Sequence, residues 1–141
     1  MTTEIDEVNP TTTPFTRPLG GPYAGLKERQ SVMWGNGPYE RMPHHYQPLL
    51  DHLVRAAAVR PGERVLDVGT GTGALAVRLA RAGAAVTGVD LAPALVQTAR
   101  RLATEEGVEV HYDVGDAEDL PYEDGCFDVV TSSVGAIFAP D

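Results

Sequence analysis

The sequence has one cysteine, few basic residues and no long apolar run, and each of these absences excludes a class of protein. The single cysteine, Cys126, cannot form an internal disulfide bond and has no partners at metal-site spacing, so we expect it to pack as a small side chain. No stretch approaches the ~20 apolar residues that span a bilayer. The first residues lack the basic and apolar regions of a secretory signal. We therefore expect a cytoplasmic chain with no metal site and no membrane span.

The charge is acidic and unevenly distributed. The chain carries 20 acidic and 11 basic residues, a formal charge of −9, and no basic run is longer than Arg100-Arg101. The sequence therefore lacks the clustered basic residues that nucleic-acid binding requires. Residues 61–141 hold 14 of the acidic and 5 of the basic residues, so the whole excess lies in this part. These carboxylates fit either a solvated acidic surface or a site that accepts hydrogen bonds from hydroxyl or amine groups.

The first 60 residues are predicted to form an arm followed by a helical cap. Residues 1–22 are rich in Thr and Pro and predict a disordered or loosely packed arm. Within the cap, residues 23–60, we expect a short helix and then a loop over 33–39, where glycines and a proline break the helix. The apolar spacing of residues 43–59 predicts an amphipathic helix.

From residue 61 onward, strand and helix patterns alternate. Short β-branched runs predict strands at 64–68, 84–90, 108–112 and 127–132, and helical spacing predicts helices at 74–81 and 93–106. Such alternation is typical of a parallel sheet with right-handed crossovers. The predicted fold class is α/β with a Rossmann-like sheet.

Three glycines follow the first predicted strand, at positions 69, 71 and 73. Glycine lets the backbone turn tightly and approach a ligand, and the helix beginning near Thr72 directs free N–H groups at the same point. A polar or anionic ligand is expected there. Gly69, Gly71 and Ala74 also match the loose G-x-G-x-x-A spacing of dinucleotide-binding proteins. A domain that binds a nicotinamide or flavin dinucleotide therefore remains an alternative.

Three carboxylates in or after the predicted strands indicate which kind of ligand could bind. Asp67, two residues before Gly69, would repel a pyrophosphate but could hold a cationic amino group. Asp90, at the end of the second strand, can accept hydrogen bonds from both hydroxyls of a ribose. Asp116 can accept from an adenine amino group while the N–H of Ala117 donates to a ring nitrogen. Together they indicate a ligand with adenine, ribose and an amino-acid-like tail.

These segments resemble the four successive motifs of class I S-adenosylmethionine-dependent methyltransferases, at residues 65–73, 86–90, 115–117 and 127–130. The loop 33–39 is similar to the N-terminal segment of small-molecule methyltransferases akin to those of quinone biosynthesis. The resemblance implies S-adenosyl-L-methionine as cofactor and methyl transfer to a small-molecule acceptor. Such a reaction is an in-line displacement, in which the protein mainly aligns the reactants, so no catalytic residue can be assigned from the sequence.

The resemblance also implies how the cofactor is held. Asp67 and the glycine loop would hold its methionine part, and Leu91 would cover one face of the adenine. Trp34 and Tyr39 would either close over the methionine end or pack on the sheet as a plain lid. The candidate cofactor-binding residues are Trp34, Tyr39, Asp67, Gly69, Thr70, Gly71, Gly73, Asp90, Leu91, Asp116, Ala117 and Ser133.

The end of the sequence departs from the family pattern. Domains of the family normally have seven strands in the order 3-2-1-4-5-7-6, whereas this sequence stops at Asp141, shortly after the fourth. We therefore expect the order 3-2-1-4 with strands 5–7 missing, in a fragment or a chain that pairs with another. Alone it would be inactive, and the exposed edge of the fourth strand would favour self-association. Two other functions stay open, namely a non-catalytic module that binds S-adenosylmethionine or S-adenosylhomocysteine, and an NAD(P)-binding oxidoreductase domain.

Overall fold

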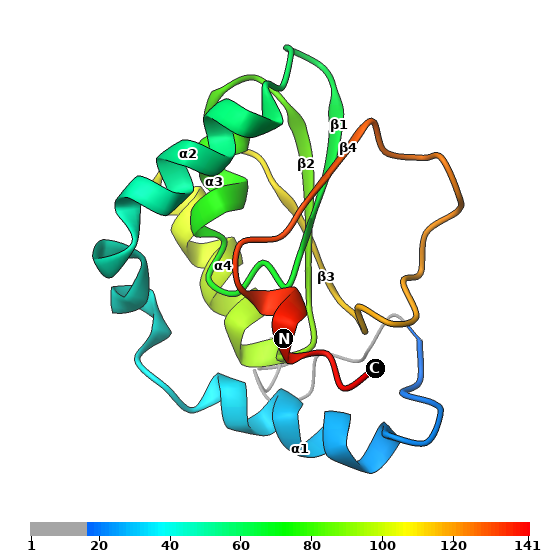
Figure 1. The fold of residues 1–141 in the computed structure, drawn as a ribbon. Coiled ribbons are helices and arrows are strands. Elements are labelled where there is room, and N and C mark those ends of the chain that lie inside the picture. The colour runs from blue at the N-terminus through cyan, green and yellow to red at the C-terminus, as the bar shows by residue number, and fades with distance from the viewer. Residues whose placement is uncertain (1–16) are drawn as a thin grey trace, which may run out of the picture.

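The structure is a computed structural model that describes residues 17–141. Its centre is a four-stranded parallel sheet in the order β3-β2-β1-β4, which confirms the predicted α/β class and strand order (Figure 1). The strands are β1 Arg64–Val68, β2 Ala85–Asp90, β3 His111–Val114 and β4 Val129–Thr131. The helices are α1 Ala24–Gly35, η2 Tyr39–His45, α2 Gln47–Ala57, α3 Ala74–Arg81, α4 Pro93–Glu105 and η3 Gly135–Phe138, of which η2 and η3 are 3-10 helices.

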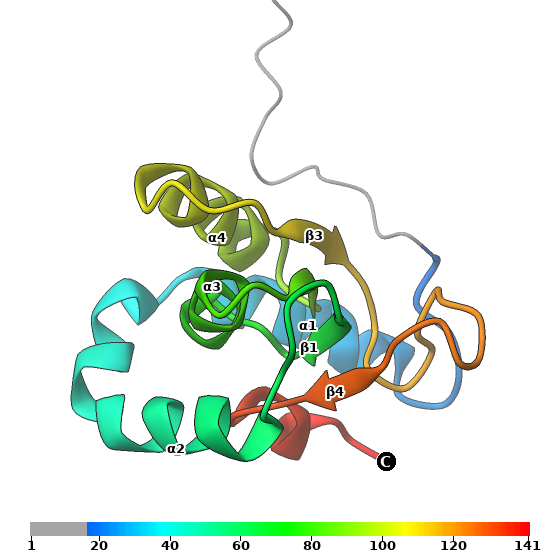
Figure 2. The same ribbon diagram turned by 90° about the horizontal axis from the view of Figure 1, so that it is seen from above.

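The two faces of the sheet are covered differently. Helices α3 and α4 pack on one face, where Val65, Val86 and Tyr112 meet Leu75 and Leu79 in the main core. Figure 2 shows both helices on the same side of the strands, with α2 packed beside α3. The other face carries a smaller cluster of buried strand residues, covered by the segment that connects β3 to β4; its members include Leu66, Val68, Val89, Leu120 and Phe127. Apolar side chains that alternate along β1 therefore bury both faces.

The third and fourth predicted strands have different bounds in the structure. The third, predicted over 108–112, runs instead from His111 to Val114, because the chain just after helix α4 is still bonded back to that helix. The Val108 N–H donates to the Ala103 carbonyl at 3.1 Å, next to Gly107 in the left-handed conformation. The fourth strand was predicted over 127–132, but only Val129–Thr131 pair with β1.

The helical cap also differs from its prediction. Helix α1 continues through Gly35 instead of ending before a loop at 33–39. Gly35 is needed there for close approach, because a Cβ on it would lie 2.9 Å from the Ala94 Cβ of α4. The helix predicted over 43–59 begins as α2 at Gln47, with Pro48 in its first turn and Pro43 inside η2.

Helix α1 of the cap lies across the end of the sheet at which the strands finish and packs against α4, whereas α2 lies beside α3 (Figure 1). Residues 1–16 of the predicted arm lie outside the described residues, and Arg17 pairs with Asp119 at 3.0 Å. Among residues 17–141, none of the helices has the length and apolar character needed to cross a membrane.

Candidate functional site

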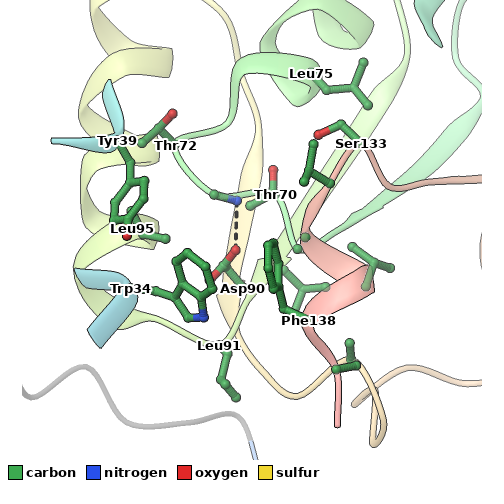
Figure 3. A pocket seen from close by; sticks show the side chains of 18 of the residues that line it. Trp34, Tyr39, Thr70, Thr72, Leu75, Asp90, Leu91, Leu95, Ser133 and Phe138 are labelled. Carbon is green, nitrogen blue, oxygen red and sulfur yellow. Dashed lines mark hydrogen bonds between the residues drawn. The ribbon is translucent and has the colours of Figure 1, made fainter. Parts of the chain in front are cut away.

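A cavity of about 250 Å³ lies at the carboxyl ends of the strands, between the sheet and the cap. It is lined by the loop after β1, the ends of β2 and β3, the helices α1 and η2, and residues 133–140. Figure 3 shows Trp34 and Tyr39 on one side of this cavity and Phe138 on the other, with Asp90 and Thr70 between them. The carboxyl end of a parallel sheet is the usual place for a ligand in such folds.

The loop after β1 forms the floor of the cavity. Gly69, Gly71 and Gly73 have φ angles of 63°, 58° and 81°, which non-glycine residues rarely adopt. The loop is held to β2 by a hydrogen bond from the Thr70 N–H to the Val89 carbonyl at 3.0 Å, and it is closed on itself by one from the Gly73 N–H to the Thr70 carbonyl at 2.9 Å. A Cβ on Gly71 would meet no protein atom within 4 Å. The backbone at Gly71 therefore faces open space that a ligand can fill.

Asp90 holds this loop from the end of β2. One of its carboxylate oxygens accepts the Gly71 N–H at 2.8 Å, the dashed line in Figure 3, and the other accepts the Ala92 N–H at 2.9 Å. Burial raises the pKa of Asp90, and the bonds from Ala92, Gly71 and Leu91 oppose this effect. Each carboxylate oxygen can accept a second hydrogen bond. Asp90 thus keeps acceptor capacity for a hydroxyl group in the cavity that it lines.

Asp67 lies beneath the loop and does not line the cavity. It is 2% exposed, and its two oxygens accept the hydroxyls of Thr70 at 2.7 Å and Thr131 at 2.9 Å. Burial raises its pKa to about 6. Asp67 therefore lies apart from the cavity lining, and its contact with the ligand stays a prediction. Its hydrogen bonds with Thr70 and Thr131 tie the loop to β4.

Gly73 also lies outside the cavity lining. It precedes the first residue of α3, and a Cβ on it would collide with the Tyr112 hydroxyl. Position 73 therefore requires glycine because a side chain would not fit against Tyr112 under the loop. The other ten candidate residues all line the cavity, including Leu91 at the end of β2 and Ser133 after β4.

A buried ion cluster lies at the end of the cavity that holds Asp116 and Ala117. The ammonium of Lys27, from α1, contacts Asp116 Oδ2 at 2.7 Å and also pairs with Glu118. Burial acts to lower the pKa of Lys27, but the hydrogen bonds and charges of Asp116 and Glu118 outweigh it, so this pKa is raised. Sequence reasoning missed Lys27, because its partners are about 90 residues away and no local pattern connects them.

Aromatic rings from three segments form the roof. Trp34 of α1 lies with its ring centre 5.7 Å from that of Tyr39 in η2 and 4.7 Å from that of Phe138 in η3. All three line the cavity, and Figure 3 shows Trp34 and Phe138 on either side of Asp90. The structure therefore brings Trp34 and Tyr39 together over the predicted site. Phe138 had no signal in the sequence, since its place depends on how residues 132–138 fold back over the loop.

Residues 65–141 match a family model described as a methyltransferase domain, which covers more than half of the chain. The chain belongs to this methyltransferase domain family. The match confirms the class I S-adenosylmethionine-dependent methyltransferase pattern that the four motifs indicate.

Known methyltransferases are among the proteins similar to this domain. It is 44% identical over 107 residues to a ubiquinone biosynthesis O-methyltransferase of Xanthomonas campestris, covering 75% of this chain and 44% of that protein. An uncharacterised protein of Mycobacterium tuberculosis is 41% identical over 117 residues, covering 82% of this chain and 43% of that protein. The chain thus spans less than half the length of the curated relatives it matches.

A solved methyltransferase structure is also similar to this chain. It is the S-adenosylmethionine-dependent methyltransferase of Geobacter sulfurreducens in complex with S-adenosylhomocysteine, with 33% identity and a TM-score of 0.54. The similarity covers 60% of this chain and 35% of that one. As to metals, the described residues contain no group of three or more His, Cys, Asp or Glu side chains suited to holding an ion.

Proposed function

We propose that this methyltransferase domain binds S-adenosyl-L-methionine in the cavity and supplies the cofactor-binding part of methyl transfer to a small-molecule acceptor. The observation that carries the proposal is the junction of Gly71 with Asp90. An open backbone surface lies beside a carboxylate that keeps spare acceptor capacity. A nucleoside with free ribose hydroxyls matches both features.

The residues around this junction fit the other parts of the cofactor. Leu91 offers an apolar surface for a purine, and Asp116 with the backbone of Ala117 offers an acceptor and a donor for its edge. Thr70, in the glycine loop, and Ser133, after β4, line the part of the cavity where the methionine part would be held. The aromatic roof over Asp90 would keep water from the bound cofactor.

The hydrogen bonding of the loop argues against a dinucleotide. A pyrophosphate needs free N–H groups at the loop and at the helix start. Here the N–H groups of Thr70, Gly71 and Gly73 already donate to acceptors of the protein. An NAD(P)-binding oxidoreductase domain is therefore the weaker alternative.

When bound, S-adenosylmethionine would supply an electrophilic methyl group on a sulfonium, and the protein's part is to align the acceptor and exclude water. Side chains of the cap and of α3 give one part of the cavity an apolar lining; they are Met42, Tyr46, Leu50 and Leu75. This lining favours an acceptor with an apolar portion. The similarity to the ubiquinone biosynthesis O-methyltransferase of Xanthomonas campestris supports the same class of reaction.

Isothermal titration calorimetry tests the proposal. The 141-residue chain should bind S-adenosylhomocysteine and not NAD. Asp90→Ala should weaken binding by about 1.5–3 kcal/mol, the scale of hydrogen bonds to a charged group. Asp124→Ala, which removes an exposed carboxylate outside the cavity, is the matched control and should bind normally. Binding of NAD without binding of S-adenosylhomocysteine would reverse the assignment.

A turnover assay tests whether the isolated chain is active by itself. We propose that these 141 residues bind the cofactor without methylating an acceptor at ordinary enzyme rates, roughly 1 per second or faster. Turnover by the isolated chain would mean that its cap alone completes the acceptor site.

A further inference from the structure

One end of the cavity is lined by uncharged, largely apolar side chains. We call it the cap end; its residues are Met42, Tyr46, Leu50 and Leu75. Tyr46 and Leu50, from the cap, pack on the core cluster that holds Leu75 of α3, so these side chains gather in one place. Figure 3 shows Leu75 and Leu91 at opposite ends of the cavity. The cap end is therefore separate from the surface proposed to hold the purine.

Charged side chains line other parts of the cavity. Among the described residues, the charged members of the lining are Lys27, Asp90 and Asp116. Lys27 is paired with Asp116 at 2.7 Å, and Asp90 accepts backbone N–H groups of the glycine loop and of Ala92. The one ionisable group at the cap end is the phenol of Tyr46; burial raises its pKa, so it is uncharged at neutral pH. A charged ligand group would therefore lose its water at the cap end without gaining a counter-charge.

Met42 borders both the cavity and the solvent. It is 47% exposed although it lines the cavity, and Tyr39, three residues earlier in η2, lines the same cavity. Residues three apart in a 3-10 helix lie on one face, so η2 presents this face to the cavity. An exposed methionine beside a cavity offers apolar surface that a ligand can cover, and its flexible thioether adapts to the shape of that ligand.

We propose that the cap end is the acceptor subsite, and that Met42 makes it select an uncharged, apolar ring system over one that carries a charge. This inference rests on the proposed function, to which it adds the chemical class of the acceptor and a residue that selects it. An uncharged ring gains by leaving water and by covering the exposed Met42 side chain. A carboxylate or an ammonium on the same ring would lose its hydration with no partner nearby, which opposes binding.

The test is calorimetry at pH 7 with probes that share one ring system. They are 2-naphthol, 2-naphthoate and 2-naphthylmethylamine, which are neutral, anionic and cationic. Each is titrated into the 141-residue chain with and without saturating S-adenosylhomocysteine. Wild-type protein should bind 2-naphthol about tenfold or more tightly than either charged probe. This binding should persist with S-adenosylhomocysteine present, since the two ligands occupy different ends of the cavity.

Exchanges of two methionines test the role of Met42. Met42→Lys should weaken binding of 2-naphthol and strengthen that of 2-naphthoate, which shifts the preference by about fivefold or more. Met42→Glu should shift it toward 2-naphthylmethylamine instead, and so tests the same role with the opposite charge. Met33→Lys is the matched control, because Met33 is 53% exposed on α1 and does not line the cavity. It should keep the wild-type preference, and thermal unfolding checks that each variant folds.

The outcomes separate this inference from the proposed function. Displacement of 2-naphthol by S-adenosylhomocysteine would mean that both use one place, and the inference would be wrong. Equal affinity for the neutral and charged probes, or equal shifts in Met42→Lys and Met33→Lys, would overturn it as well. Failure of the wild type to bind S-adenosylhomocysteine would instead count against the proposed function.

Discussion

The backbone of Gly135 lies directly against the backbone of Gly69. A Cβ on Gly69 would be 2.6 Å from the Gly135 Cα, and a Cβ on Gly135 would be 2.5 Å from the Gly69 Cα. No side chain separates the loop after β1 from η3. This contact brings Ser133 and Phe138 to the cavity, so the last part of the chain is positioned by the glycine loop.

Gly135→Ala should destabilise the fold by about 1–3 kcal/mol, the usual cost of overpacking a tight contact. Gly135 does not have a positive φ, so the effect reports the collision alone. Urea denaturation measures the free energy of unfolding. Gly20→Ala, where a Cβ meets nothing within 4 Å and φ is also not positive, is the control and should unfold like the wild type. Equal stability of both variants would mean that η3 can move away from the loop at no cost.

Gly71→Ala should lower affinity for S-adenosylhomocysteine by tenfold or more, because the methyl group would occupy the space in front of the loop. Gly107→Ala is matched to it, since both glycines have positive φ, 58° and 68°, and neither added Cβ meets protein within 4 Å. Both variants should lose about 1 kcal/mol of stability from backbone strain. Only Gly71→Ala should bind the ligand more weakly, as measured by calorimetry. Equal affinities would place the ligand away from Gly71.

Asp67→Asn should gain stability relative to the wild type as the pH rises. The native pKa of Asp67, about 6, lies above its ordinary value of 3.8, so between these values the folded state binds the proton more tightly than the unfolded chain. The contribution of Asp67 to the free energy of unfolding therefore falls as the pH rises through this window, by up to about 3 kcal/mol. An asparagine can still hydrogen-bond Thr70 and Thr131 but does not titrate.

Denaturation of both proteins at pH 4 and pH 7 measures this effect of Asp67. The difference between variant and wild type should grow in favour of the variant. A difference that is constant with pH would show that the folded protein leaves the pKa of Asp67 at its ordinary value.

Tyr112→Phe should leave the protein as stable as the wild type or more stable. The Tyr112 hydroxyl is buried and, within residues 17–141, lacks a hydrogen-bond partner, so removing it removes a desolvation cost. Tyr122→Phe is the counterpart, because the Tyr122 hydroxyl donates to Asp113 at 2.8 Å. That variant should lose about 1–2 kcal/mol. Thermal and urea unfolding compare the two, and a destabilised Tyr112→Phe would point to a buried water on this hydroxyl.

Val130→Lys should reduce self-association of the isolated chain. Val130 lies on the edge strand β4 and is 63% exposed, and a charged residue on an exposed edge opposes strand pairing. Val32→Lys is the control, because Val32 is 65% exposed but belongs to α1. Sedimentation velocity should show association in the wild type and in Val32→Lys. A monomeric wild type at high concentration would remove the edge as a cause of association.

The sheet and most of the cavity floor were predictable because their signals are local. Short β-branched runs between helices determine a parallel sheet, and its strand order follows from the family resemblance. The glycine loop and Asp90 each stand at the end of a predicted strand. Asp67 shows the limit of this reasoning. Its position before the loop indicates proximity to the ligand, but only the path of the backbone decides that it lies underneath.

The cap and roof could not be predicted, because they depend on contacts between distant residues. The loop predicted to begin at Met33 begins only after Gly35, because Gly35 is the last residue of α1 and its missing side chain lets the helix pack against Ala94. The pairing of Lys27 with Asp116 and the ring contact of Phe138 with Trp34 likewise join segments about 90 to 100 residues apart. Contacts between residues so far apart leave no local pattern in a single sequence, so they cannot be predicted from it.

Trp34 is the only tryptophan in the sequence, and its indole lies in the cavity roof between Tyr39 and Phe138. Its emission therefore arises from one place, next to the surface that a ligand would cover. Quenching or a wavelength shift on ligand addition reports events in this cavity without a label, and the signal cannot come from elsewhere in the chain. Trp34 thus serves as an intrinsic fluorescent probe of ligand binding in the cavity.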